Sequence, residues 1–164
     1  MSPKAYKQER WSLADLFSSI DSPEIQKAQK DLEKILQGYE GYREKLSPEL
    51  DETQFLSILE DYEKAGKVLS RLGAYGSLRF SEDTQDQAAQ AFQAQMQQLS
   101  ANVDNRMMFF TLWWKGLEEA DAQRFLDASG DYRYWLEALR LKKPYTLTEA
   151  EEKVINLKDV NGPR

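Results

Sequence analysis

The sequence predicts an all-α protein, a helical bundle with three long helices and shorter C-terminal helices. Apolar residues recur at helical spacing through three long stretches of the 164-residue chain. No stretch alternates apolar and polar residues as a half-buried strand does. Serine, proline and acidic residues at the starts of several stretches are typical of helix N-termini.

The central helix is predicted over residues 55–80, because one helical stripe there holds large apolar residues at both ends and three glycines between. The stripe consists of Phe55, Ile58, Leu59, Tyr62, Gly66, Leu69, Gly73, Gly76 and Phe80. A glycine inside a helix costs about 1 kcal/mol relative to alanine, so three on one line predict that another backbone passes close by. A second side turns apolar through Val68, Leu72 and Tyr75. A helix that is apolar on two sides is expected at the centre of a bundle.

A first long helix is predicted before it. Ser22 suits the N-cap and Pro23 the first helical position. Helical spacing of apolar residues continues to about Leu46, and Ser47-Pro48 ends the pattern, so that the central helix begins at about Asp51 or Thr53. Residues 1–10 are polar and expected to be loose. They precede a short anchor on the bundle, formed by Trp11, Leu13, Leu16 and Phe17.

A third long helix is predicted after a turn at residues 81–86. Its apolar stripe consists of Ala88, Ala89, Phe92, Met96, Leu99, Val103, Met107, Phe110, Trp114 and Leu117. The stretch 107–114 is apolar almost all round, which indicates buried core. The alternative is a surface that another domain or partner covers.

The elements after Gly116 are shorter. One helix is expected over 119–128 and ends at Ser129-Gly130; Asp131 is expected to cap the next, which stops at Lys142-Lys143-Pro144. Thr148 and Glu151 form a capping box that opens a last helix, running to about Leu157. Residues 158–164 are expected to be turn or linker.

The composition restricts the chemistry, because the chain has no cysteine and no histidine. The absence of cysteine excludes disulfides, thiolate metal sites and a cysteine nucleophile. The absence of histidine excludes, within this chain, the His-Glu-x-x-His zinc site, serine–histidine triads and the Glu-x-x-His di-iron site. We therefore expect no metal and no active site in the chain itself.

Charge and hydropathy argue against nucleic-acid and membrane partners. The net charge is −6, and the 22 lysines and arginines are scattered, unlike a phosphate-binding surface. Residues 1–10 lack the apolar segment of a secretory signal. The longest apolar run, at 107–114, is far shorter than the about 20 residues of a membrane span. These features predict a soluble, cytoplasmic protein.

Two kinds of polar pattern are candidate sites. Carboxylates gather at 118–121 and 149–152, but both groups lie in first helical turns, where the helix dipole favours negative charge. The candidate we single out is Arg71, Tyr75 and Arg79, at i, i+4 and i+8 on one ridge of the central helix. Two cations and a phenol on an exposed ridge would suit an anionic group or the carboxylates of a partner. The alternative is that the arginines are solvated or bind within the domain.

Three stretches together resemble the oligoendopeptidase F family of zinc metallopeptidases (thimet-oligopeptidase-like). Arg10-Trp-Ser-Leu-Ala-Asp-Leu-Phe17 with Ile20-Asp-Ser-Pro-Glu24 is similar to the opening of that family. Arg71-Leu-Gly-Ala-Tyr-Gly-Ser-Leu-Arg-Phe80 with Asp83-Thr84 resembles its central N-domain helix. Pro144-Tyr-Thr-Leu-Thr-Glu-Ala-Glu-Glu-Lys-Val154 resembles the segment that leads towards its catalytic part. In order and approximate spacing they span residues 10–155.

The resemblance implies that residues 1–164 are a single helical N-terminal domain, with 158–164 leading to a missing catalytic domain. In that family the catalytic domain carries His-Glu-x-x-His, a zinc ion and a water activated by the glutamate, and the N-terminal domain helps to form a cleft that admits short peptides. This chain has no histidine, so it would not hydrolyse peptides alone, and zinc would belong to the missing domain.

The implied partners are the downstream catalytic domain and short peptide substrates. Arg71, Tyr75 and Arg79 would then contact substrate or the other domain, and so would the apolar stretch 107–114. The alternative is a free-standing helical protein-interaction module that docks a partner through the same ridge. A reading frame that continues past Arg164 into His-Glu-x-x-His would favour the peptidase.

Overall fold

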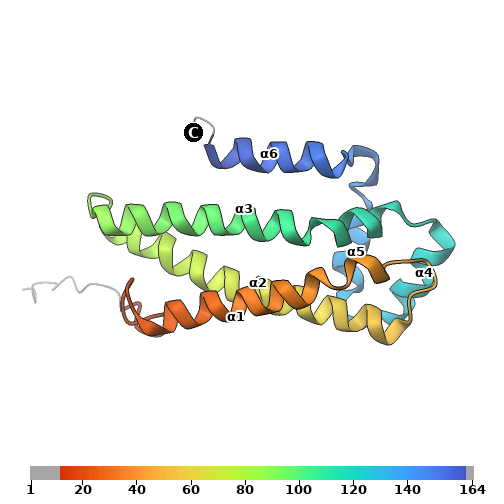
Figure 1. The fold of residues 1–164 in the computed structure, drawn as a ribbon, viewed down its shortest axis with the longest axis horizontal. Helices are drawn as coiled ribbons and strands as arrows, with labels where there is room; N and C mark the ends of the chain where they lie inside the picture. The colour runs from red at the N-terminus through yellow and green to blue at the C-terminus, as the bar shows by residue number, and fades with distance from the viewer. Residues whose placement is uncertain (1–11, 162–164) are drawn as a thin grey trace, which may run out of the picture.

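The computed structural model describes residues 12–161, and this part of the chain is all α-helical with no strand, as predicted (Figure 1). The elements are α1 Pro23–Glu40, η1 Arg43–Lys45, α2 Glu52–Glu82, α3 Gln87–Gly116, α4 Glu119–Ala128, η2 Gly130–Tyr132, α5 Arg133–Arg140, η3 Lys143–Tyr145 and α6 Glu149–Asn161, where η denotes a short 3-10 helix. Three long helices followed by shorter ones match the expected order.

The polar residues at the helix starts act as caps. The Ser22 hydroxyl accepts a hydrogen bond from the backbone N–H of Ile25 at 3.4 Å, and the Asp51 carboxylate accepts one from Thr53 at 2.9 Å. Thr148 and Glu151 bond reciprocally: the backbone N–H of Thr148 donates to Glu151 at 2.9 Å and that of Glu151 to the Thr148 hydroxyl at 3.4 Å. These bonds satisfy N–H groups that have no partner inside a helix.

The structure corrects three predicted boundaries. The first helix ends at Glu40 and not near Leu46, because the backbone N–H of Gly41 bonds back to Gly38 and Tyr39 and closes the last turn. Asp131 lies in η2 and caps nothing, since α5 begins two residues later. Helix α6 continues to Asn161, so residues 158–161 of the expected linker are helical. The expected loose segment 1–10, and Trp11 of the anchor, lie outside the described residues.

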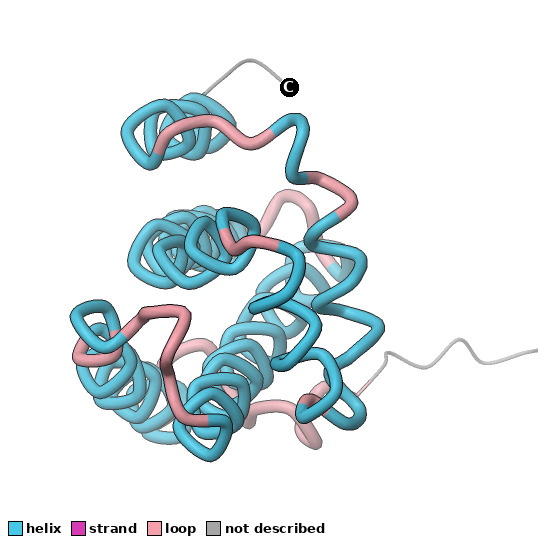
Figure 2. The backbone as a smooth tube through the Cα atoms, turned by 90° about the vertical axis from the view of Figure 1, so that its right-hand side faces the viewer, coloured by secondary structure: helices cyan, strands magenta, loops and turns pink. Residues whose placement is uncertain are grey.

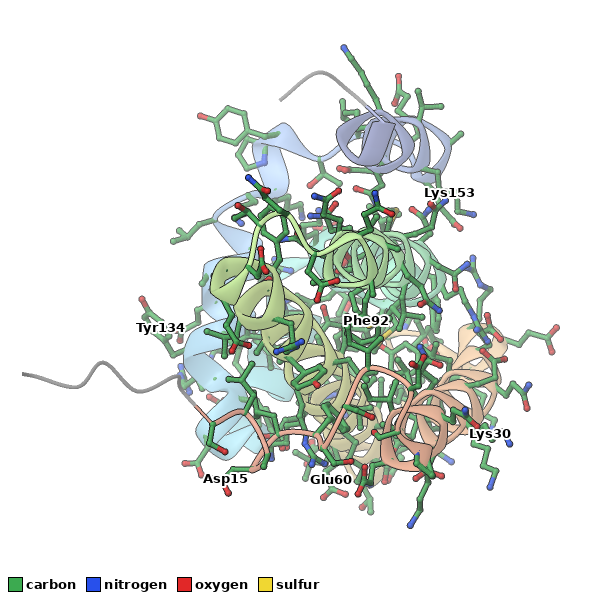
Figure 3. The ribbon with its side chains drawn as sticks, turned by 90° about the vertical axis from the view of Figure 1, so that its left-hand side faces the viewer. Asp15, Lys30, Glu60, Phe92, Tyr134 and Lys153 are labelled. Atoms are coloured by element: carbon green, nitrogen blue, oxygen red, sulfur yellow. The ribbon has the colours of Figure 1, made fainter. Side chains whose placement is uncertain are left out.

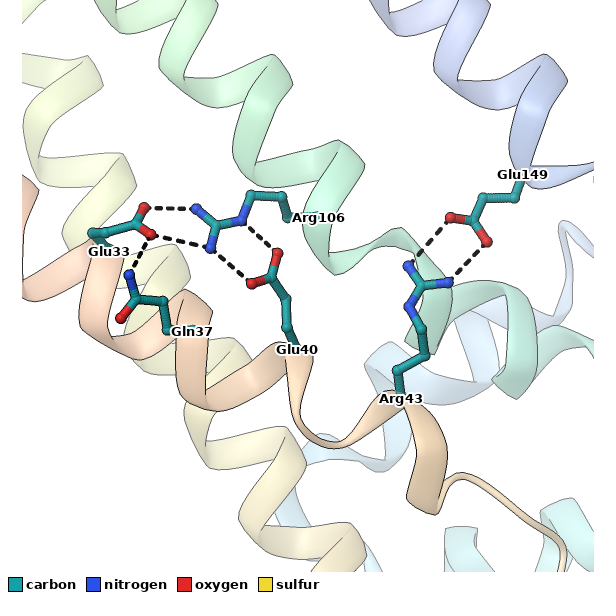
Figure 4. A network of polar contacts seen from close by, with 6 residues as sticks. All are labelled: Glu33, Gln37, Glu40, Arg43, Arg106 and Glu149. Carbon is teal, nitrogen blue, oxygen red and sulfur yellow. Dashed lines mark hydrogen bonds and ion pairs between the residues drawn. The ribbon is translucent and has the colours of Figure 1, made fainter.

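The helices form layers, which two orthogonal views of the backbone show. Helix α2 packs against both α1 and α3, while α6 packs on α3 on the side away from α1 and α2 (Figures 1 and 2). The predicted central position of α2 is thus confirmed, and α3 is equally central because it contacts α1, α2, α5 and α6. Arg106 of α3 also ties α3 to α1, through Glu33 at 2.6 Å and Glu40 at 2.7 Å (Figure 4).

An aromatic cluster joins the long helices to the shorter ones. Phe55 of α2 is fully buried. The centre of its ring lies 4.4 Å from that of Phe125 of α4 and 5.7 Å from that of Trp114 of α3. The Trp114 indole N–H donates to the carbonyl of Leu136 at 2.9 Å, which fixes α5 on α3. The buried-core interpretation of 107–114 is confirmed for Met107, Phe109, Phe110 and Trp114.

The three glycines of the α2 stripe do not share one environment. A Cβ on Gly76 would lie 3.3 Å from the Phe92 ring and 3.4 Å from Met96, whereas nothing lies within 4 Å of the corresponding position at Gly66 or Gly73. Figure 3 shows Phe92 directed into the bundle. The predicted close approach is therefore real at Gly76 only, and side chains rather than a second backbone make it.

Candidate functional site

The predicted ridge of Arg71, Tyr75 and Arg79 is occupied by the chain itself. The Arg71 guanidinium donates to the carbonyl of Leu16 and lies 4.3 Å from the centre of the Phe17 ring. Tyr75 is buried, in edge contact with the same ring at 5.4 Å. Residue Phe17 is buried as the predicted anchor requires, so this part of α2 holds the segment before α1 in place.

The third ridge residue, Arg79, contacts the turn between α2 and α3. Its guanidinium pairs with Glu82 and lies 3.7 Å from Asp86. The expectation of an exposed Tyr75 was wrong, because its ring is buried in edge contact with the rings of Phe17 and Phe92. The role of the three residues in contacting substrate or another domain stays a prediction, with Arg71 as the exposed member.

Large apolar side chains are exposed near the C-terminal end of the described chain. We call them the C-terminal apolar set: Tyr134, Leu141, Tyr145, Leu147, Val154 and Ile155. Tyr134 is 82% exposed and Tyr145 83%, and Figure 3 shows Tyr134 pointing away from the bundle. Scattered single apolar residues are normal on a surface, but six large ones within residues 134–155 make this segment a candidate interaction surface.

Helix α6 is attached to the bundle by polar contacts. Arg43 of η1 donates to both carboxylate oxygens of Glu149, at 3.1 and 3.2 Å (Figure 4). Farther along, the Asn156 amide donates to the side chain of Asn105 at 2.9 Å. None of the α6 residues whose burial is described belongs to the buried core. The hydrogen bonds from Arg43 and Lys153 lower the pKa of Glu149 to about 2.

An apolar groove lies between α2 and the η2–α5 segment, and we call it the α2–α5 groove. Its volume is about 520 Å³, and it is lined by Leu59, Tyr62, Glu63, Gly66, Lys67, Ser70, Tyr132 and Trp135. The rings of Tyr62 and Trp135 are 4.8 Å apart and form one wall. Gly66 lies in the open part of the groove, since a Cβ at this position would meet no atom within 4 Å.

The rim of the α2–α5 groove carries one acid and one base. The Tyr132 hydroxyl donates to Glu63 at 3.1 Å, and the Lys67 ammonium lies 2.8 Å from the other oxygen of Glu63. Hydrogen bonds from Lys67 and Tyr132 hold the pKa of Glu63 below its usual value, so this carboxylate stays ionised at neutral pH. Sequence reasoning missed this groove: Gly66 was the visible signal, but its partner Trp135 is far away in the chain.

The donor atoms of the chain do not suit a zinc ion. The sequence has neither histidine nor cysteine, and residues 12–161 contain no cluster of three or more carboxylates that could hold a metal. Protein zinc sites use nitrogen and sulfur donors, with carboxylates in a minority. Within the same residues, no helix combines the length and hydropathy that a membrane span requires.

The class of protein defined by this geometry is an all-α bundle with an exposed C-terminal apolar set and an apolar groove. Comparison with protein families adds a name: residues 113–163 match the family model described as Oligopeptidase F, which represents the N-terminal domain of that family. The match confirms the expected resemblance over about a third of the chain; the stretches around 10–24 and 71–84 lie outside it. Searches of curated proteins and of solved structures found no match.

Proposed function

We propose that this chain is the N-terminal helical domain of an oligopeptidase F-like zinc peptidase of the cytoplasm. It forms one wall of a cleft that admits short peptides, and it is not catalytic by itself. Zinc and peptide-bond hydrolysis belong to a separate catalytic domain. The observation that carries the proposal is the match of residues 113–163 to the family model.

The position of the C-terminal apolar set supports the choice of partner. All six of its residues lie inside the matched range 113–163. The most recognisable part of the chain is therefore also the part that leaves large apolar side chains uncovered. Covering them with a catalytic domain would remove apolar surface from water, which is worth about 25 cal/mol per Å².

A mixing experiment tests the proposal. The matching catalytic portion is expressed separately, loaded with zinc and mixed with this chain, and cleavage of a short quenched fluorescent peptide is followed. We expect the two proteins to associate, and the chain to change the rate or the length preference of cleavage. If the chain neither binds nor alters cleavage, the proposal is wrong.

Charged substitutions in the C-terminal apolar set locate the contact. Leu141→Glu combined with Val154→Glu should weaken association at least tenfold, since it buries two carboxylates in an apolar interface. Gln26→Glu with Gln95→Glu is the matched control, because it adds the same charge at exposed positions of α1 and α3. Both double variants should keep the helical circular dichroism of the parent chain.

The alternative is a free-standing interaction module that docks through Arg71, Tyr75 and Arg79. The contacts of these residues with Leu16, Phe17 and the α2–α3 turn favour the peptidase-domain proposal over this one. Failure of the mixing experiment would reverse that preference.

A further inference from the structure

We propose that the α2–α5 groove is a binding site for an apolar or aromatic side chain of a short peptide. The inference rests on the proposed function for one point, that the ligand is a peptide. None of the residues that line the groove belongs to the C-terminal apolar set, so different substitutions test the two.

The size of the groove favours a short peptide segment over a folded partner. Ligand sites in proteins usually measure about 300–1,000 Å³, and the groove measures about 520 Å³. An α-helix with its side chains is about 10–12 Å across and rises 5.4 Å per turn, so roughly one turn would fill this volume. One or two residues of an extended peptide therefore suit the groove better than a helix of a folded partner does.

The walls of the groove are suited to an apolar ligand. Tyr62 and Trp135 supply aromatic faces, and Leu59 adds an aliphatic surface. The Tyr132 hydroxyl donates a hydrogen bond of 3.1 Å to Glu63, and this bond keeps the Tyr132 ring in place. Aromatic groups packed against such a wall gain stabilisation beyond the burial of area.

The rim is complementary to the charges of a short peptide. Lys67 is 69% exposed and Glu63 46%, so both remain accessible while paired with each other. The ammonium can bind a peptide carboxylate, and the carboxylate can bind a peptide amino terminus. In a short peptide every side chain lies within a few residues of a charged terminus, whereas an internal loop of a folded protein has none, so the groove fits an oligopeptide better.

The experiment is a nuclear magnetic resonance titration of the isolated chain with the tetrapeptide Ala-Ala-Phe-Ala, up to about 5 mM. We expect the indole signal of Trp135 and the amide signal of Gly66 to shift. The tetra-alanine peptide should bind at least tenfold more weakly, because it offers only methyl groups to the aromatic wall. The phenylalanine peptide with blocked termini should also bind more weakly, since the rim then has no charged partner.

A pair of glycine substitutions makes the titration decisive. Gly66→Leu places a side chain in the groove, where its Cβ would meet no atom within 4 Å, and it should abolish the shift at Trp135. Gly73→Leu is the matched control, because Gly73 lies on the same helix with equally open surroundings and does not line the groove. Neither change should unfold α2, since leucine is a better helix former than glycine.

Three outcomes would overturn the inference. They are no shift at Trp135 with the phenylalanine peptide, equal binding of tetra-alanine, or unchanged binding by Gly66→Leu. If Gly66→Leu instead abolishes association with the catalytic portion while the peptide causes no shift, the groove is an interdomain contact. Because the titration uses this chain alone, its failure leaves the mixing experiment, and thus the proposed function, to be judged independently.

Discussion

At the scale of single residues, glycines with the same place in a helical pattern have different roles. Gly76 lets α2 approach the Phe92 and Met96 side chains of α3, whereas Gly66 and Gly73 face open space. The helical stripe in the sequence gives no difference between these three glycines. What separates them is which side chains of α3 reach that line: Phe92 and Met96 meet the Cβ position of Gly76, and no atom lies within 4 Å of that position at Gly66 or Gly73.

This difference predicts opposite effects of substitution on stability. Gly73→Ala should raise the free energy of unfolding by up to about 1 kcal/mol, because alanine is the better helix former. Gly76→Leu should lower it by about 1–3 kcal/mol, because the new side chain overpacks the contact with Phe92. Urea unfolding followed by circular dichroism measures both. Equal effects at the two positions would contradict the assigned contacts.

At the scale of elements, α6 differs from the other helices in how it is held. Its described contacts with the bundle are hydrogen bonds and an ion pair, made by Glu149 and Asn156 at two points along the helix. The pKa of Glu149, about 2, lies below its ordinary value of 4.5. The ionised carboxylate therefore stabilises the attachment above about pH 4.5, and this contribution is lost as the pH falls towards 2.

The Arg43→Gln substitution tests this attachment. It removes the largest cause of the lowered pKa, so the pKa of Glu149 should rise towards 4.5, and amide hydrogen exchange in α6 should become faster at neutral pH. Carbon-detected titration of the Glu149 carboxyl gives the pKa. Lys158→Gln on the same helix is the control and should leave both quantities unchanged. A pKa of Glu149 that does not respond to Arg43→Gln would disprove the ion pair.

At the scale of the whole molecule, the buried apolar cluster formed by the described side chains includes no residue of α6. Every residue of the buried apolar cluster lies between Phe17 and Leu136. A chain that ends after residue 147 should therefore keep its cooperative unfolding and lose no more than roughly 2 kcal/mol, since exposed ion pairs and hydrogen bonds contribute about 1 kcal/mol or less each. Circular dichroism during urea unfolding measures this. Loss of a cooperative transition would mean that α6 is part of the core.

The helices could be predicted because their signals are local. Ser22, Asp51 and the Thr148–Glu151 box cap helices where the sequence places them. The predicted end of α1 and the predicted start of α5 were wrong, because helix bounds depend on backbone hydrogen bonds in the terminal turns, such as those of Gly41. The periodic spacing of apolar residues continues past the end of such a helix, so it does not indicate where the helix ends.

The candidate site was less predictable than the fold. The ridge at Arg71, Tyr75 and Arg79 has the correct helical spacing, but the tertiary structure places Phe17 over it. The α2–α5 groove combines Tyr62 with Trp135, which are far apart in sequence. No pattern within a helix can indicate which distant side chain will complete a groove.

The amino-acid sequence by itself determined that the protein is all-α, that α2 is central, and that the chain lacks the histidine and cysteine of a zinc site. Composition and periodicity decide these properties, and both are readable residue by residue. Only the tertiary structure decided which glycine is packed, that Tyr75 is buried, and that Tyr134, Tyr145 and Val154 are exposed. Those properties depend on which faces of the helices meet, and that is set by packing across long sequence separations.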